Sequence, residues 1–92
     1  MAALIRWSPK AIFNLEDICN YIAKDSQINA VNIAKKIVSQ IEKIPIFPKS
    51  GRIVPEFNNE IFRELFFNNY RIIYCIKKEV IKLLLFVMAQ DY

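Results

Sequence analysis

The stretch that decides the fold is residues 61–88, IFRELFFNNYRIIYCIKKEVIKLLLFVM, which is rich in β-branched and aromatic residues. Two polar dipeptides, Asn68-Asn69 and Lys78-Glu79, divide it into three runs that are typical of β-strands. These runs are residues 61–67, 70–77 and 80–88. Asn tolerates a positive φ better than most residues, so Asn68-Asn69 predicts a two-residue hairpin turn, and Lys78-Glu79 is a less typical second turn. The stretch therefore predicts an antiparallel meander.

Residues 45–60, immediately before the meander, show no clean hydrophobic period. Pro45, Pro48, Gly51 and Pro55 interrupt this segment, and proline and glycine are the strongest breakers of regular structure. We therefore expect one long loop here.

Two amphipathic helices are expected upstream of this loop. Ser8 suits an N-cap and Pro9 the first helical position, while Asp25-Ser26 ends the first helix and offers the N-cap of a second. The apolar positions that share a face are Ala11, Leu15, Ile18 and Ile22 in the first helix, and Ala30, Ile33, Ala34, Ile37, Ile41 and Ile44 in the second. Pro45 limits the second helix, and the two apolar faces predict a helical hairpin with a very short connection.

Residues 3–7 are short and apolar and predict one further strand ahead of the helices. The expected order is βααβββ, an α+β fold in which the helical hairpin packs on a curved, mainly antiparallel sheet. Because 92 residues suffice for one hydrophobic core and not for two, we expect a single domain over residues 1–92.

The composition excludes several classes of site. The chain has no histidine, which removes Ser-His-Asp triads, imidazole bases and histidine metal ligands. Its single glycine cannot form a Walker A loop or a dinucleotide-binding loop. Its two cysteines, Cys19 and Cys75, share no metal-type spacing, and Cys19 is expected to pack as a small apolar side chain. We therefore expect no cofactor and no metal.

Composition and charge also indicate where the chain works. A core this rich in apolar residues needs no disulfide framework, which favours a reduced, cytoplasmic protein. Composition leaves the pairing of the two cysteines open. Arg6 interrupts the apolar start, so no signal peptide is visible, and residues 83–89 are far shorter than the ~20 residues that span a bilayer. The net charge of +4 does not by itself imply strong nucleic-acid binding.

Several segments, in this order, resemble the RelE/ParE superfamily of toxins from bacterial type II toxin–antitoxin modules, also called plasmid stabilisation proteins. They are residues 5–11 (IRWSPKA), 14–18 (NLEDI), 21–23 (YIA), Ala30, 46–56 (IFPKSGRIVPE), 63–65 (REL) and 70–74 (YRIIY). The resemblance implies one of two activities. RelE-like members cleave mRNA on the ribosome, and ParE-like members poison DNA gyrase. The long paired helices and the Trp-Ser-Pro opening are similar to the ParE branch.

The end of the chain, FVMAQDY at residues 86–92, departs from this pattern. Many relatives close with a histidine followed by one or two arginines, and the end of this chain has neither residue. The departure disfavours the ribonuclease activity. It also leaves open a third alternative, an inactive homologue that only binds an antitoxin.

A ribonuclease without histidine would need other groups. Transphosphorylation requires a base, an acid and cations for the developing phosphorane charge. Arg63 and Arg71 could supply the cations, and Glu56, Tyr74 or Tyr92 would have to move protons. The simpler alternative is that both arginines face one side of a half-exposed sheet and pair with Glu64 or with antitoxin carboxylates. We therefore expect binding rather than catalysis.

A binding surface is expected where the loop meets the first two meander strands. Its candidate partner- or target-binding residues are Lys49, Arg52, Arg63, Arg71 and Tyr74. Their cations would attract phosphates or an acidic protein, although scattered, solvated cations are an equally good interpretation. Apolar residues also exceed what one small sheet face needs: consecutive Leu83, Leu84 and Leu85 alternate between faces, so both faces must be covered or one stays apolar and open. A partner helix or an added strand would cover it.

The function implied by the resemblance is that of a ParE-like toxin, which binds and poisons DNA gyrase without breaking a bond itself. The implied partners are a cognate antitoxin and gyrase, or the ribosome and mRNA for the RelE-like alternative, and no membrane is implied. A homodimer and a heterotetramer with the antitoxin are both compatible with the resemblance.

Overall fold

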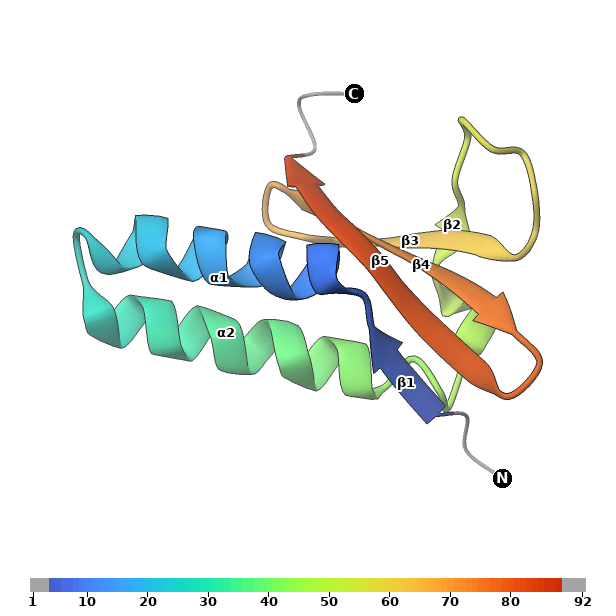
Figure 1. Ribbon diagram of the computed structural model, residues 1–92, viewed down its shortest axis with the longest axis horizontal. Helices are drawn as coiled ribbons and strands as arrows, with labels where there is room; N and C mark the ends of the chain where they lie inside the picture. Colours follow the sequence, from blue (N-terminus) through green and yellow to red (C-terminus); the bar gives the residue numbers. More distant parts are fainter. Residues whose placement is uncertain (1–3, 89–92) are drawn as a thin grey trace.

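The computed structural model describes residues 4–88, whose elements run from one strand through two helices to four further strands (Figure 1). The elements are β1 (Leu4–Trp7), α1 (Pro9–Ala23), α2 (Gln27–Glu42), the 3-10 turn η1 (Pro48–Ser50), β2 (Arg52–Ile53), β3 (Phe62–Phe67), β4 (Tyr70–Lys77) and β5 (Val80–Met88). The predicted α+β class, the two helices and the three-stranded meander are confirmed.

Both helices begin at the predicted serine caps. The Ser8 hydroxyl accepts a hydrogen bond from the Ala11 amide at 3.0 Å and donates one to the Leu84 carbonyl at 2.7 Å, so the same side chain caps α1 and ties it to β5. The Ser26 hydroxyl accepts from the Asn29 amide at 3.1 Å at the start of α2. These bonds satisfy amides that would otherwise lack a partner in the first turn of each helix.

The sheet has five strands in the order β1-β5-β4-β3-β2. β1 lies parallel to β5, and the other neighbours are antiparallel. The expected order lacked β2, which lies inside the predicted loop. The prediction missed this strand. Arg52 and Ile53 are too few residues to show a hydrophobic period, and they form a strand only through pairing with Glu64 and Arg63 on β3. Ala3, the predicted first residue of β1, lies outside the described residues.

The two meander turns bend as the dipeptides predict. Asn68 has φ 52° and Lys78 has φ 50°, both in the left-handed region. Farther along, β5 is interrupted by a bulge, because Tyr74 pairs with Leu83 while Ile73 pairs with Leu85. The expectation of three leucines alternating between faces is therefore modified: Leu84 is the extra residue of the bulge.

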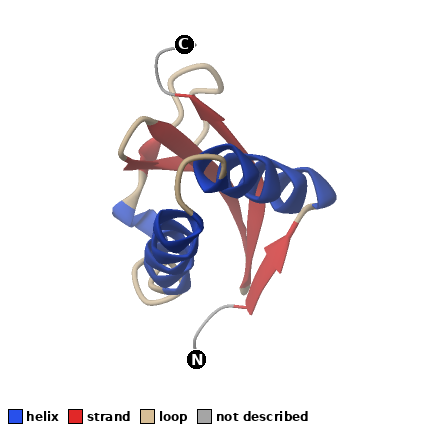
Figure 2. Ribbon diagram, turned by 90° about the vertical axis from the view of Figure 1, so that its left-hand side faces the viewer, coloured by secondary structure: helices blue, strands red, loops and turns tan. Residues whose placement is uncertain are grey.

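The core lies between the helical hairpin and one face of the sheet. Its fully buried members come from α1, α2, the segment after α2, β4 and β5: Ala11, Ile37, Ile41, Ile44, Ile72, Tyr74, Ile81, Leu83 and Phe86. Figure 2 looks along the hairpin from its tip, with the strands behind it. In Figure 1 the same hairpin extends well beyond the sheet, so that only its base is packed against strands. Within residues 4–88, neither helix has the length and apolar character needed to cross a bilayer.

Candidate functional site

A polar cluster joins the long loop to the middle of the sheet. We use this name for Arg52, Glu56, Arg63, Glu64, Arg71 and Tyr74. The ribonuclease candidates in the described part of the chain all lie near this loop, but the sheet divides them: Glu56 and Arg71 lie on one face with the predicted binding residue Arg52, and Arg63 and Tyr74 lie on the other. Tyr92, the remaining proton-transfer candidate, lies outside the described residues.

Glu64 stands at the centre of this cluster, only 1% exposed. Its carboxylate accepts a hydrogen bond from Arg71 Nε at 2.8 Å and forms ion pairs with Arg71 Nη2 and with Arg52 Nε. Arg71 reaches on to Glu56, which it binds through two parallel hydrogen bonds of 3.0 and 3.1 Å. The charges alternate as Glu56, Arg71, Glu64 and Arg52, so the row is neutral as a whole.

The expectation that Arg63 and Arg71 face one side of the sheet is wrong, because Arg63 lies with Tyr74 on the other face. There both residues hold the loop through its backbone. Arg63 donates to the carbonyl oxygens of Glu60, Gly51 and Lys49 at 2.8, 3.1 and 3.4 Å. The Tyr74 hydroxyl donates to the Pro48 carbonyl at 2.7 Å and accepts from the Gly51 amide at 3.1 Å. These contacts satisfy backbone groups of a segment that has almost no secondary structure of its own.

The protonation of the cluster follows from these contacts. Hydrogen bonds from Arg71 hold the pKa of Glu56 below its usual range. Burial disfavours the charge of Arg71, but its hydrogen bonds to Glu56 and Glu64 outweigh burial and raise its pKa. Burial also raises the pKa of the Tyr74 hydroxyl. Glu56 and Arg71 are thus charged near neutral pH, and Tyr74 is protonated.

The structure separates the predicted site residues by exposure. Arg63, Arg71 and Tyr74 are buried, whereas Lys49 and Arg52 are exposed. The buried guanidinium and hydroxyl groups bind partners within the chain, so they shape the loop rather than present free groups to solvent. Glu64, which the sequence suggested only as a pairing partner, is the hub. The sequence signal was its position in a strand between Arg63 and Leu65. Successive strand residues point to opposite faces, so Glu64 points away from the face that Arg63 and Leu65 share.

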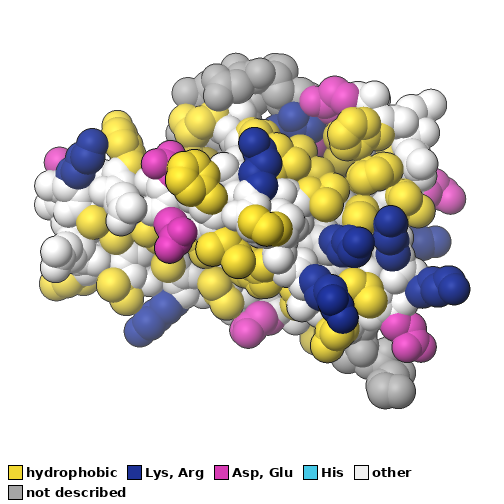
Figure 3. All heavy atoms as spheres, viewed as in Figure 1, with side chains coloured by type: hydrophobic (Ala, Val, Ile, Leu, Met, Phe, Trp, Pro, Cys, Tyr) yellow, Lys and Arg dark blue, Asp and Glu magenta, His cyan; other side chains and the backbone are white. Residues whose placement is uncertain are grey.

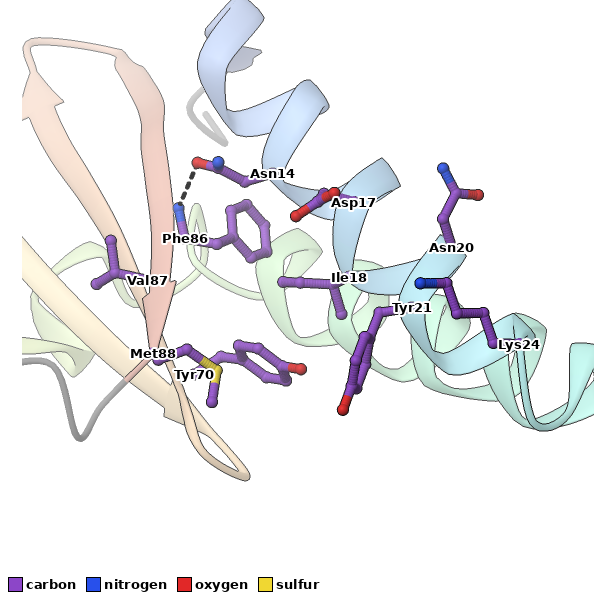
Figure 4. A pocket seen from close by; sticks show the side chains of 10 residues that line it. All are labelled: Asn14, Asp17, Ile18, Asn20, Tyr21, Lys24, Tyr70, Phe86, Val87 and Met88. Carbon is purple, nitrogen blue, oxygen red and sulfur yellow. Dashed lines mark hydrogen bonds between the residues drawn. The ribbon is translucent and has the colours of Figure 1, made fainter.

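A groove lies where α1 leaves the sheet (Figure 4). Its volume is about 450 Å³, and it is lined from α1 by Asn14, Asp17, Ile18, Asn20, Tyr21 and Lys24 and from the strands by Tyr70, Phe86, Val87 and Met88. Figure 4 shows Tyr70 and Met88 extending from the sheet toward Ile18 and Tyr21 on the helix. The Asn14 side-chain oxygen accepts from the Phe86 amide at 3.1 Å and closes one end. We call this feature the α1–β5 groove.

The α1–β5 groove combines an apolar floor with a polar edge. Tyr21, on the outer edge, is 70% exposed although it is a large aromatic residue, and Lys24 Nζ lies 5.9 Å from the centre of its ring. The helix extends past the sheet at this point, so the tyrosine finds no strand to cover it.

The described residues offer no metal ligands in a group: within residues 4–88, no three His, Cys, Asp or Glu side chains lie close enough to hold an ion. Cys19 and Cys75 are both free thiols. Burial raises the pKa of Cys19, which fits a packing role better than a nucleophilic one.

Comparison with known proteins identifies the family. A model of the family described as "ParE toxin of type II toxin-antitoxin system, parDE" matches residues 5–91. The fold is similar to that of a chain in the solved structure of the chromosomal ParDE TA system from P. aeruginosa, with a TM-score of 0.77 and 19% identity, over 95% of this chain and 96% of that one. No curated protein matches in sequence. Because the family model spans almost the whole sequence, the chain belongs to the ParE toxin family of type II toxin–antitoxin systems.

Proposed function

We propose that this ParE-family chain acts by binding and poisoning DNA gyrase, and that a cognate antitoxin neutralises it in the cytoplasm. The observation that carries the proposal is the contrast between the polar cluster and the α1–β5 groove. The groups that an RNA-cleaving site would use are engaged inside the chain, while a groove of mixed polarity stays open to a macromolecule.

The engagement of the cluster favours binding over cleavage. A phosphorane is stabilised by cations that are free to meet it, but the charge of Arg71 is already matched by Glu56 and Glu64. Arg63 directs its donors at loop carbonyls. Using either residue on RNA would require the loop to leave the sheet and expose Glu64.

The α1–β5 groove fits an amphipathic helix of a partner. Such a helix would place apolar side chains on Ile18, Tyr70 and Met88, and polar ones beside Asp17 and Lys24. We propose this groove as the antitoxin site. Poisoning would then follow from a second contact, in which the toxin binds the cleaved gyrase–DNA state better than the intact one and so shifts the population toward it.

Gyrase supercoiling assays test the proposal. Added toxin is expected to inhibit supercoiling and to accumulate cleaved DNA, and unchanged supercoiling at micromolar toxin would refute it. Translating ribosomes with labelled mRNA should leave the message intact. Codon-dependent cleavage would instead establish the RelE-like alternative, and antitoxin binding without either effect would identify an inactive homologue.

The groove is tested by a matched pair of variants on α1. Tyr21→Ala removes an aromatic side chain from the groove, whereas Phe13→Ala removes one that is 64% exposed on the same helix and does not line it. We expect Tyr21→Ala to weaken antitoxin binding by about 10-fold or more in calorimetry, because tyrosine is among the residues that most often carry the binding energy of an interface that buries them. Equal losses in both variants would exclude the groove as the specific site.

A further inference from the structure

A group of exposed cations lies on the sheet face opposite the helices. It consists of Arg6 on β1, Lys77 on β4, Lys78 in the β4–β5 turn and Lys82 on β5, around a shallow apolar hollow that includes Ile76 and Val80. Figure 3 shows Lys and Arg side chains gathered on this part of the molecule. We call these four residues the cationic face. None belongs to the polar cluster or the α1–β5 groove.

The register of the strands brings like charges together. Arg6 pairs with Lys82 across the parallel β1–β5 ladder, so the two side chains leave the same face of neighbouring strands. Strands in a sheet lie about 4.8 Å apart, and like charges in directly opposite positions lower stability. The polar cluster alternates its charges, but the cationic face does not.

Within residues 4–88, no ion pair compensates this charge. Among residues 4–88, ion pairs involve Arg52 and Arg71 with Glu56 and Glu64, and none includes a member of the cationic face. Glu79 is the one acidic residue within the β4–β5 turn, next to Lys78. The cationic face therefore carries excess positive charge that is open to an external anion.

The shape and lining of the surface indicate the class of anion. The hollow is broad and open and its lining includes no aromatic residue, whereas sites for single-stranded nucleic acid use aromatic platforms. Lys77 on β4 lies opposite Val80 on β5, two residues from Lys82. The backbone positions of Lys77 and Lys82 are therefore offset by about 6.6 Å along the strands and about 4.8 Å across them, or about 8 Å in all. A row of cations on an open surface suits successive phosphates of a duplex better than one enclosed anion.

We propose that the cationic face binds the phosphate backbone of duplex DNA without reading its sequence. Four Lys and Arg contacts give weak, salt-sensitive binding, which agrees with the modest net charge of +4. The contact is separate from the antitoxin groove and does not depend on gyrase as the target. If gyrase is the target, the same face would let the toxin hold the DNA that the enzyme has cleaved.

Fluorescence anisotropy with a labelled duplex of about 20 base pairs tests this directly, with no gyrase present. Four phosphate contacts predict that affinity falls about 150-fold between about 50 and 200 mM salt, because each contact adds about 0.9 to the log–log slope. In the double variant Arg6→Gln/Lys82→Gln, with two contacts left, the fall is expected to be only about 12-fold.

A second double variant serves as the control. Lys35→Gln/Lys36→Gln removes the same charge from exposed positions on α2, which is not part of the sheet. This variant is expected to leave the salt slope near that of the unchanged chain. An equal reduction of the slope by both variants would overturn the proposal, since net charge alone would then explain binding. Tighter binding of polyglutamate than of DNA, lost in Arg6→Gln/Lys82→Gln, would overturn it in favour of an acidic protein.

Folding does not confound the test. Removing two opposed like charges relieves their repulsion, so Arg6→Gln/Lys82→Gln is expected to melt at or above the temperature of the unchanged chain. Should it melt lower, Lys77→Gln/Lys78→Gln removes the other two contacts and must reduce the slope by a similar amount. A full slope in that variant would likewise refute the proposal.

Discussion

At the scale of single residues, Glu64 explains why a chain with several cations near its loop does not present them all to solvent. Its buried carboxylate binds Arg71 and Arg52, and Arg71 carries the row on to Glu56. A buried charge is tolerated only when it is paired and hydrogen-bonded. Arg71, a predicted binding residue, is therefore engaged inside the chain, and Arg63 is engaged by the loop carbonyls. Their role in binding a partner stays a prediction, and on this geometry it would be indirect.

The arginines on either side of Glu64 should differ in their effect on stability. Arg71→Ala leaves the buried Glu64 with one partner and is expected to lower the free energy of unfolding by about 3 kcal/mol. Arg52→Ala removes a side chain that is 52% exposed and should cost about 1 kcal/mol or less. Urea unfolding measures both, and equal losses would contradict the central place of the Arg71–Glu64 pair.

Glu56 gives the cluster a pH dependence. Hydrogen bonds from Arg71 lower its pKa in the folded chain from the ordinary value of 4.5, so folding favours the charged form. The stabilisation is present above the ordinary glutamate pKa and is lost as the pH falls through the lowered value. Urea unfolding of the unchanged chain and of Glu56→Gln should therefore differ near neutral pH and converge in acid. A constant difference across that range would show that this pair does not titrate as described.

At the scale of elements, the turns and the loop are fixed in different ways. The β3–β4 and β4–β5 turns each place one residue at positive φ, Asn68 and Lys78, and this is a local property. The loop depends on contact with the sheet instead. At Gly51 an added Cβ would lie 2.6 Å from the Tyr74 hydroxyl oxygen and 2.7 Å from the Glu64 carbonyl oxygen, so only glycine lets the loop approach this closely.

Lys78 has a positive φ of 50°, a backbone conformation that suits glycine better than lysine. An L-residue with a branched or long side chain pays about 1–2 kcal/mol in the left-handed region, and glycine does not. Lys78→Gly is expected to raise the melting temperature by a few degrees, equivalent to about 0.5–1 kcal/mol after the added entropy of glycine.

The neighbouring residue provides the control for this prediction. Positive φ among the described non-glycine residues is confined to Asn58, Asn68 and Lys78, so Glu79 has no such strain to relieve. Glu79→Gly should therefore leave the melting temperature unchanged or lower it. A rise in Glu79→Gly equal to that in Lys78→Gly would show that backbone strain at position 78 is not the cause.

At the scale of the whole molecule, the helical hairpin is attached to the sheet at its base and open at its tip (Figure 1). Ile37 and Ile41 of α2 are fully buried in the shared core, while Ile28, near the tip, is 74% exposed. Trp7 and Phe86 stack with ring centres 5.9 Å apart beneath the start of α1. This uneven attachment creates the α1–β5 groove, since the helix leaves the sheet before its apolar residues end.

Replacing isoleucine with alanine at two positions of α2 compares the packing at the base of the hairpin with that at its tip. Ile37→Ala is expected to lower the free energy of unfolding by about 2–5 kcal/mol, because it leaves a cavity in the core. Ile28→Ala should change it by less than about 0.5 kcal/mol, since the side chain is exposed and alanine is a better helix former. Equal effects in chemical unfolding would mean that the tip of the hairpin is as tightly packed as its base.

The sequence by itself determined the features that depend on neighbours along the chain. The two serine caps, the apolar faces of both helices and the three meander strands follow from hydrogen bonds and periodicities within a few residues, and the structure confirms them. It also predicted one binding surface from Lys49, Arg52, Arg63 and Arg71, and that surface stays a prediction. In the structure Arg52 and Arg71 share Glu64, whereas Arg63 bonds the loop from the other face of the sheet.

The directions of these side chains, and the set of cations left exposed, depend on long-range strand pairing. Strand β2 exists through its pairing with β3, and β1 meets β5 although more than 70 residues separate Arg6 from Lys82. Glu64 neutralises Arg71 because two strands and a loop bring their charges to one place. Burial, pairing and like-charge contacts are long-range quantities that no local pattern encodes. For this reason the sequence left the partner of Arg71 open between Glu64 and an antitoxin carboxylate, and it did not predict the cationic face.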